Sequence, residues 1–181
     1  MLALRLATND DVPALHALID RSVRGLNASL YTDAEVESAL RHVFGPDTQL
    51  IADRTYFVID APDGTLAAAG GWSRRRTLYG GDQTKGADDP LLDPAVDPAR
   101  IRAFFVDPAW ARRGLARQLF DRCAADARAA GFRALALGAT LPGVPLYRAL
   151  GFVEIGRVDA AMPDGLVLAI VEMGKEIGPA E

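Results

Sequence analysis

Apolar and polar residues recur at regular spacing along most of the chain, and this spacing predicts the secondary structure. Strict alternation indicates strands, whereas apolar residues three or four positions apart indicate helices. Capping residues and glycines mark where the helices begin and end. In chain order, the predicted elements are a strand over 2–7, a helix from Val12 to near Gly25, a helix from Thr32 to Gly45, strands over 55–60 and 65–72, a strand over 100–106, a helix over 115–130, a strand over 133–140, a short helix over 142–150, and strands over 152–157 and 166–173.

The order of these elements predicts the fold class. The run over 100–106 is almost continuously apolar, which is typical of a central strand covered on both faces. Residues 74–98 show no periodicity and are expected to form a long loop, and loops of this length are often functional. The whole pattern predicts a mixed α/β architecture with helices on both sides of a central sheet. Because 181 residues fit one domain, 1–181 is expected to be a single domain.

Composition narrows the functional classes. The formal net charge of −4 argues against nucleic acid as a partner. With one cysteine, Cys123, and two histidines, His16 and His42, neither an internal disulfide nor a metal centre is expected. Cys123 lies on an apolar helical stripe and is expected to be a structural thiol. Apolar runs stay shorter than the ~20 residues that span a bilayer, and the chain enters its first strand without a charged leader. We therefore expect a cytoplasmic protein without a membrane partner.

The most informative segment is the turn that follows the strand over 100–106. A helix is expected to begin there at Gly114, and the first N–H groups of a helix lack partners within it. Gly114 and Ala116 are small enough for a phosphate to approach the backbone. Three arginines add positive charge around the same point: Arg112, Arg113 and Arg117. This arrangement predicts a diphosphate cradle, although a tight turn with solvated arginines would show the same residues.

The surrounding elements resemble the GNAT superfamily of acetyl-coenzyme A-dependent N-acetyltransferases. The family's phosphate-binding pattern, Gln/Arg-x-x-Gly-x-Gly/Ala, maps onto 111–116, and Tyr147 to Phe152 follows at the expected place. Ala111 departs from the first position of the pattern, which removes a side-chain contribution and leaves the backbone cradle. The resemblance spans roughly 100–158. It implies a mixed, mostly antiparallel central sheet with helices on both faces and splayed strands that hold the cofactor.

The resemblance also implies roles for individual residues. The Val106 backbone would bind pantetheine in the gap between splayed strands, and the Phe104 N–H would polarise the acetyl carbonyl. Tyr147 would protonate the departing thiolate, although a core-facing aromatic would show the same pattern. Thr140 stands where many relatives have an asparagine that contacts the cofactor. The implied cofactor-binding residues are Phe104, Phe105, Val106, Arg112, Arg113, Gly114, Leu115, Ala116, Arg117, Thr140 and Tyr147, with Tyr147 and Phe104 also catalytic.

Four residues are candidates for contacts with the acceptor. Trp72 and Arg74 follow the Gly70-Gly71 pair, and paired glycines in a strand indicate close approach of a ligand or another backbone. Arg24 and Tyr31 belong to the helical hairpin that covers the acceptor site in the family. Protection of an edge strand explains the first pair equally well, and packing or helix termination explains the second.

The expected activity is acetyl transfer from acetyl-coenzyme A to a primary amine of a small molecule or a protein. The family often places a glutamate base on the strand of Phe104, but Arg100 stands at that position, so the sequence names no base. This difference and Ala111 motivate the alternative of a non-catalytic acyl-coenzyme A-binding or regulatory module. Transfer of a longer acyl chain is a third option. The resemblance also allows a homodimer, although no residue pattern specifies one.

Overall fold

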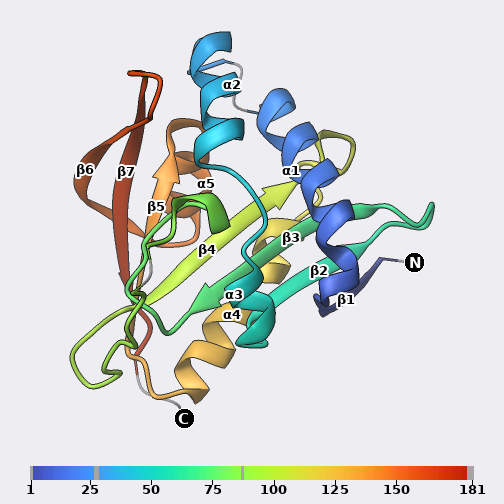
Figure 1. Cartoon of the computed structure of the whole chain (residues 1–181). Helices are drawn as coiled ribbons and strands as arrows, with labels where there is room; N and C mark the ends of the chain where they lie inside the picture. Colours follow the sequence, from blue (N-terminus) through green and yellow to red (C-terminus); the bar gives the residue numbers. More distant parts are fainter. Residues whose placement is uncertain (1, 27–28, 87, 179–181) are drawn as a thin grey trace.

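The computed structural model describes residues 2–26, 29–86 and 88–178, which form a twisted sheet between helical layers (Figure 1). Within these residues the sheet has seven strands in the order β1-β2-β3-β4-β5-β7-β6. The strands are β1 (Ala3–Leu6), β2 (Tyr56–Asp60), β3 (Leu66–Ser73), β4 (Ala99–Val106), β5 (Ala134–Thr140), β6 (Val153–Ala161) and β7 (Val167–Glu176). The helices are α1 (Val12–Leu26), α2 (Asp33–His42), α3 (Thr48–Ala52), α4 (Leu115–Ala129) and α5 (Val144–Ala149).

The pairing of the strands confirms a mixed and mostly antiparallel sheet. Strand β4 pairs with β5 in parallel, and the other neighbouring strands pair antiparallel. Strand β7 lies between β5 and β6, so the last two strands form the predicted antiparallel pair at one edge of the sheet. This arrangement places β4 at the centre, as its apolar run predicts.

The helices cover both faces of the sheet. Figure 1 shows α1, α2 and α3 on one face and α4 on the opposite face. Alternation along β2 divides the core in the same way, because Tyr56 packs with Leu15 of α1 on one side and Phe57 packs with Leu119 of α4 on the other. The sheet is therefore the wall between two apolar layers, and any cleft through it must open where two strands separate.

Local signals in the sequence place most elements correctly. Thr32 caps α2 and exchanges hydrogen bonds with Glu35, as the capping-box pattern predicts. The hairpin of β2 and β3 forms around its Pro-Asp-Gly turn. The sequence missed the short helix α3, whose five residues are too few for a helical period. The expected loop over 74–98 contains a 3₁₀ turn at Asp82–Thr84 and a bridge between Arg75 and Leu91.

Strand β4 carries a bulge opposite β3 and separates from β5. Phe105 pairs with Ala69 and Arg102 pairs with Gly71, so two residues of β4 stand opposite one residue of β3. Within the bulge Ala103 has a φ of 55°, which lies in the left-handed region. Pairing with β5 is confined to Ala99 and Arg100. The two strands are therefore apart from the bulge onward, as the family resemblance implies.

A buried ion pair braces the bulge. The Arg102 guanidinium contacts the Asp47 carboxylate at 3.0 Å, and both side chains are almost fully buried. Arg102 also donates to the carbonyl oxygen of Thr77 at 2.8 Å, and Lys85 contacts Asp47. Loop 77–85 and the segment between α2 and α3 are thus fastened to β4 beside its bulge.

This ion pair leads to a prediction about stability. Removing one partner of a buried pair leaves the other charge uncompensated, so Asp47→Ala is expected to lower the free energy of unfolding by about 3–5 kcal/mol. Glu154→Ala removes an exposed ion pair with Arg157, and its cost is expected to stay below about 1 kcal/mol. Urea unfolding of the two variants measures both values. A loss below about 1 kcal/mol for Asp47→Ala would show that the pair does not brace the fold.

Candidate active site

A cleft of about 570 Å³ runs along β4 where it separates from β5. Its walls come from α1, the bulge of β4, the start of α4, the segment over 78–81, and α5 with the turn before it. All of the predicted cofactor-binding residues except Arg113 line this cleft: Phe104, Phe105, Val106, Arg112, Gly114, Leu115, Ala116, Arg117, Thr140 and Tyr147. The fold therefore brings residues from Phe104 to Tyr147 together in one cavity.

The start of α4 forms one end of the cleft. Gly114 is the N-cap residue, with φ of 80° and ψ of 5°. This left-handed geometry favours glycine, and a Cβ at this position would meet nothing within 4 Å, so the space in front of the helix is open. Among the described residues no side chain caps the helix. The first N–H groups of α4 and its positive dipole end therefore face an open space that suits an anion.

The arginines around this turn differ in their positions. Arg112 and Arg117 line the cleft, and Arg117 also donates to the carbonyl oxygen of Ala149 at 3.4 Å. Arg113 instead stacks on Trp110, with its guanidinium carbon 4.7 Å from the ring centroid. Trp110 lines the cleft and was missed in the sequence, although an aromatic residue just before a glycine turn is a usable signal.

Phe104 and Tyr147 meet at the middle of the cleft. Their rings lie edge to face with centroids 6.5 Å apart. The ring of Phe104 also lies against Gly70 of β3, where a Cβ would come within 2.7 Å of it. The glycine pair in β3 is therefore explained by packing within the chain: Gly70 admits Phe104, and a Cβ at Gly71 would meet the carbonyl oxygen of Thr55. Of the two predicted alternatives, Gly71 therefore fits close approach of another backbone.

The environment of Tyr147 controls its protonation. Its ring packs edge to face against Phe152 as well, with centroids 5.8 Å apart. Desolvation by these neighbours disfavours the phenolate, so the pKa of Tyr147 is raised above its usual value. The hydroxyl of Tyr147 therefore stays protonated at neutral pH.

Helix α1 closes the cleft along β4. The Ser22 hydroxyl accepts a hydrogen bond from the Val106 N–H at 3.2 Å, and Ser22 lines the cleft. Arg21 pairs with Asp107 at 2.7 Å, which holds α1 against the end of β4. The Val106 amide, expected to bind pantetheine, is thus bonded to Ser22 in this structure. The sequence did not predict this contact of Ser22, because a single serine inside a helix does not indicate a site residue.

Trp72 and Arg74 lie away from the cleft. Trp72 is buried on the α4 face of β3 and packs edge to face against Phe132, with centroids 6.0 Å apart. Arg74 is exposed, and its guanidinium carbon lies 5.5 Å from the centroid of the Trp72 ring. Neither residue is part of the cleft lining, because alternation along β3 directs Trp72 into the core.

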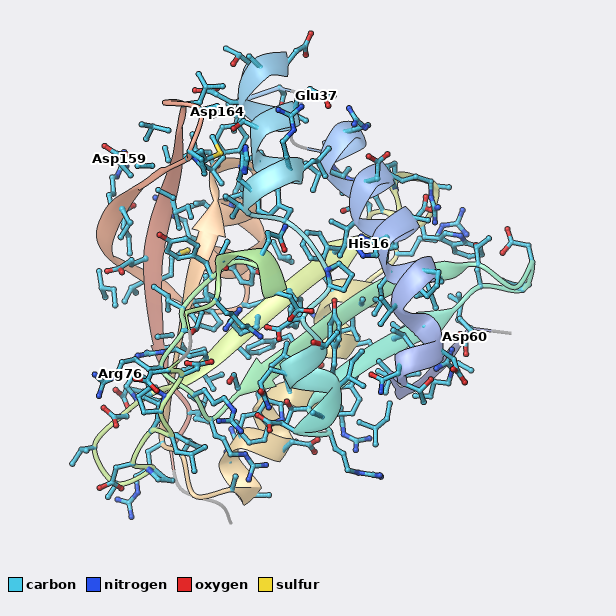
Figure 2. All side chains as sticks on the ribbon, in the orientation of Figure 1. His16, Glu37, Asp60, Arg76, Asp159 and Asp164 are labelled. Carbon is cyan, nitrogen blue, oxygen red and sulfur yellow. The ribbon has the colours of Figure 1, made fainter. Side chains whose placement is uncertain are left out.

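Arg24 and Tyr31 also lie outside the cleft lining. Arg24 is exposed and pairs with Asp20 and Glu37, and Figure 2 shows Glu37 on α2 beside α1. The Tyr31 hydroxyl donates to the carbonyl oxygen of Ala169 and accepts from the N–H of Leu141, both at 2.8 Å. The Arg24–Glu37 pair joins α1 to α2, and the Tyr31 contacts fasten the segment between these helices to β7 and to the turn after β5.

The remaining reactive side chains lie apart from the cleft. Cys123 is fully buried on the inner face of α4, and burial raises the pKa of its thiol. Asp107 is paired with Arg21, and Glu154 is paired with Arg157. Among residues 2–26, 29–86 and 88–178, no cluster of three or more His, Cys, Asp or Glu side chains is arranged to hold a metal ion. No helix in this part of the chain has the length and apolar character needed to cross a bilayer.

Comparisons with known proteins agree with this geometry. The family model described as "Acetyltransferase (GNAT) domain" matches residues 93–173, which contain β4, the turn at Gly114, α4 and Tyr147. No curated protein sequence matches the chain at a significant level.

Solved structures share the fold over nearly the whole chain. A GCN5-related N-acetyltransferase from Rhodopseudomonas palustris is 20% identical, with 97% of this chain and 95% of that chain covered and a TM-score of 0.69. A GCN5-related N-acetyltransferase from Kribbella flavida is 22% identical, with coverage of 97% and 98% and a TM-score of 0.58. The PaiA N-acetyltransferase from Thermoplasma acidophilum, solved in complex with coenzyme A, is 12% identical, with coverage of 98% and 99% and a TM-score of 0.62.

The family model thus matches the segment that carries the start of α4 and Tyr147, and the solved structures show that the chain has the GNAT fold.

The open space at Gly114 gives a test of the anion site. Gly114→Glu would place a carboxylate in front of α4, so the dissociation constant for coenzyme A is expected to rise by about 10-fold or more, equivalent to ~1.4 kcal/mol. Gly64→Glu is the matched control, because Gly64 also has a positive φ and open space but lies in the turn between β2 and β3. In both variants the left-handed backbone is expected to lower the free energy of unfolding by a similar amount, about 1–2 kcal/mol. Calorimetry with coenzyme A measures the difference, and equal affinities for the two variants would refute the anion site.

Proposed function

We propose that this chain transfers an acetyl group from acetyl-coenzyme A to a primary amine. The observation that carries the proposal is the convergence of two features on one cleft. The start of α4, which suits an anion, lies at one end, and the rings of Phe104 and Tyr147 lie edge to face further along the cleft. Support also comes from the structural neighbours named as N-acetyltransferases, one of which was solved with coenzyme A.

Different residues of the cleft would bind different parts of acetyl-coenzyme A. The N–H groups of Leu115, Ala116 and Arg117 would bind the diphosphate, with Arg112 and Arg117 adding positive charge. Pantetheine would lie along β4 in the space left by β5. The Val106 N–H would bind it in place of Ser22, which requires that the Ser22 hydroxyl yields this hydrogen bond. Thr140 lines the opposite wall and is able to contribute one hydroxyl contact.

The chemical step would be direct attack of a neutral amine on the acetyl carbonyl. The new C–N bond forms as the carbonyl becomes an oxyanion, and the Phe104 N–H would stabilise that charge, an effect typically worth ~3 kcal/mol. Collapse of the intermediate breaks the C–S bond, and Tyr147 would give its proton to the departing thiolate. The amine loses its proton to water.

The role of Tyr147 is testable with two tyrosine variants. Tyr147→Phe keeps the ring and removes the proton donor, so kcat is expected to fall by about 100-fold while the KM for acetyl-coenzyme A changes little. Tyr31→Phe makes the same chemical change outside the cleft, so it is expected to lower stability and leave kcat nearly unchanged. Thiol release over a panel of primary amines measures both. An unchanged kcat in Tyr147→Phe would exclude the acid role, and no thiol release by the wild-type chain with any amine would refute the transfer activity.

Burial of Tyr147 also predicts the pH dependence of turnover. Because desolvation raises the pKa of the phenol above its usual value of about 10, the protonated form persists as the pH rises. At saturating substrates, kcat is therefore expected to show no alkaline decline between pH 7 and about pH 9.5. A decline centred near pH 8 would mean that a different acid, with a lower pKa, serves the reaction.

A further inference from the structure

The cleft continues past the bulge of β4 into a second region with a different lining. The cofactor end is formed by the start of α4, whereas this region lies under α1, the segment between α2 and α3, and the segment over 78–81. Three aromatic side chains line it: Phe44, Tyr79 and Phe105. The aliphatic residues Val23 and Leu78 complete the same walls. If the donor occupies the proposed place along β4, this region is where an acceptor must lie.

The three rings come from three separate segments and line this part of the cleft. Phe105, on the α1 face of β4, lies edge to face with Phe44, with centroids 6.2 Å apart and an interplanar angle of 81°. Tyr79 lies over Gly138 of β5, where a Cβ would be 3.4 Å from the Tyr79 Cβ and 3.5 Å from its Cδ1. Gly138 thereby lets Tyr79 pack close to β5. The rings thus stand on both sides of the gap between β4 and β5.

The segments that carry Phe44 and Tyr79 are fastened to each other. The Gly81 N–H donates to the carbonyl oxygen of Val43 at 2.8 Å, and the Asp82 N–H donates to that of Pro46 at 3.0 Å. A Cβ at Gly81 would come within 2.6 Å of the Gly45 carbonyl oxygen, so the two backbones touch. The Asp47–Arg102 pair then holds both segments to β4. The aromatic walls are therefore preformed, which reduces the entropic cost of binding.

Tyr79 also separates the cleft from a neighbouring cavity of about 410 Å³. The two spaces share Val43, Leu78 and Tyr79, and the second is also lined by Thr77, Gln83 and His42. The Tyr79 side chain thus limits how far an acceptor extends from the cleft. Removing it would join the two spaces and remove one aromatic wall.

We infer that the acceptor is a primary amine that carries an aromatic ring, bound between Phe44, Phe105 and Tyr79 with its amine directed toward Phe104 of the bulge. The inference rests on the proposed acetyl transfer and names the substrate class for it. Aromatic rings prefer edge-to-face or offset contacts with centroids 4.5–7 Å apart, and three preformed rings offer such contacts to a fourth.

The experiment compares phenethylamine, propylamine and cadaverine as acceptors at saturating acetyl-coenzyme A. Burial of the ring is expected to give phenethylamine a kcat/KM at least about 10-fold above that of propylamine. Tyr79→Ala and Phe44→Ala are each expected to lower this ratio by about 10-fold, whereas Tyr79→Phe keeps it. Leu91→Ala, at an exposed position away from the cleft, is the control and leaves the ratio unchanged. Retained turnover of propylamine shows that a variant is folded, because this short amine does not reach the rings.

A second readout separates this inference from the proposed function. Ligand-observed NMR measures binding of phenethylamine to the chain saturated with coenzyme A. Binding that depends on Tyr79 without thiol release from any amine would refute the acetyl transfer and uphold the aromatic site. Thiol release that is as fast with propylamine or cadaverine as with phenethylamine would uphold the transfer and overturn the aromatic acceptor. A ratio that is unchanged in both alanine variants would overturn it as well.

Discussion

The parallel pairing of β4 with β5 ends after Arg100, and the site depends on this break. Backbone N–H and C=O groups inside a protein need partners, so a central strand that leaves its neighbour must find them elsewhere. Here the bulge at Ala103 turns the strand, the Tyr56 hydroxyl donates to the Ala103 carbonyl oxygen at 3.4 Å, and Ser22 takes the Val106 N–H. The space that remains between the strands is the cleft. In the proposed function, the donor supplies the missing strand.

The cleft joins two regions with opposite chemistry. At one end, the start of α4 and the nearby arginines present positive charge at the protein surface. At the other end, three aromatic rings stand on braced segments of the chain and line the cleft. Phe104 and Tyr147 lie between them, where a thioester would meet an amine. Because both ends are built on β4 or fastened to it, the bulge sets the position of the donor and of the acceptor at once.

Local features of the chain were predictable, and long-range ones were not. The capping box at Thr32, the hairpin and the helix start at Gly114 each depend on a few neighbouring residues, and each was inferred correctly. Trp72 was misplaced because the small residues around it in β3 give no polar contrast that would identify its face. Phe44 and Tyr79 carry no local signal, since their surroundings arise from contacts between segments more than thirty residues apart.

Amide hydrogen exchange in the presence of coenzyme A tests the central claim most directly. The first amides of α4, at Leu115, Ala116 and Arg117, lack partners within the helix and are expected to exchange quickly in the free protein. On saturation with coenzyme A, their exchange and that of the Phe104 amide in the bulge are expected to slow by about 10-fold or more, while amides of the distant turn at Gly64 are unaffected. Protection that spares both the start of α4 and the bulge would contradict the proposal that the break between β4 and β5 is the donor site.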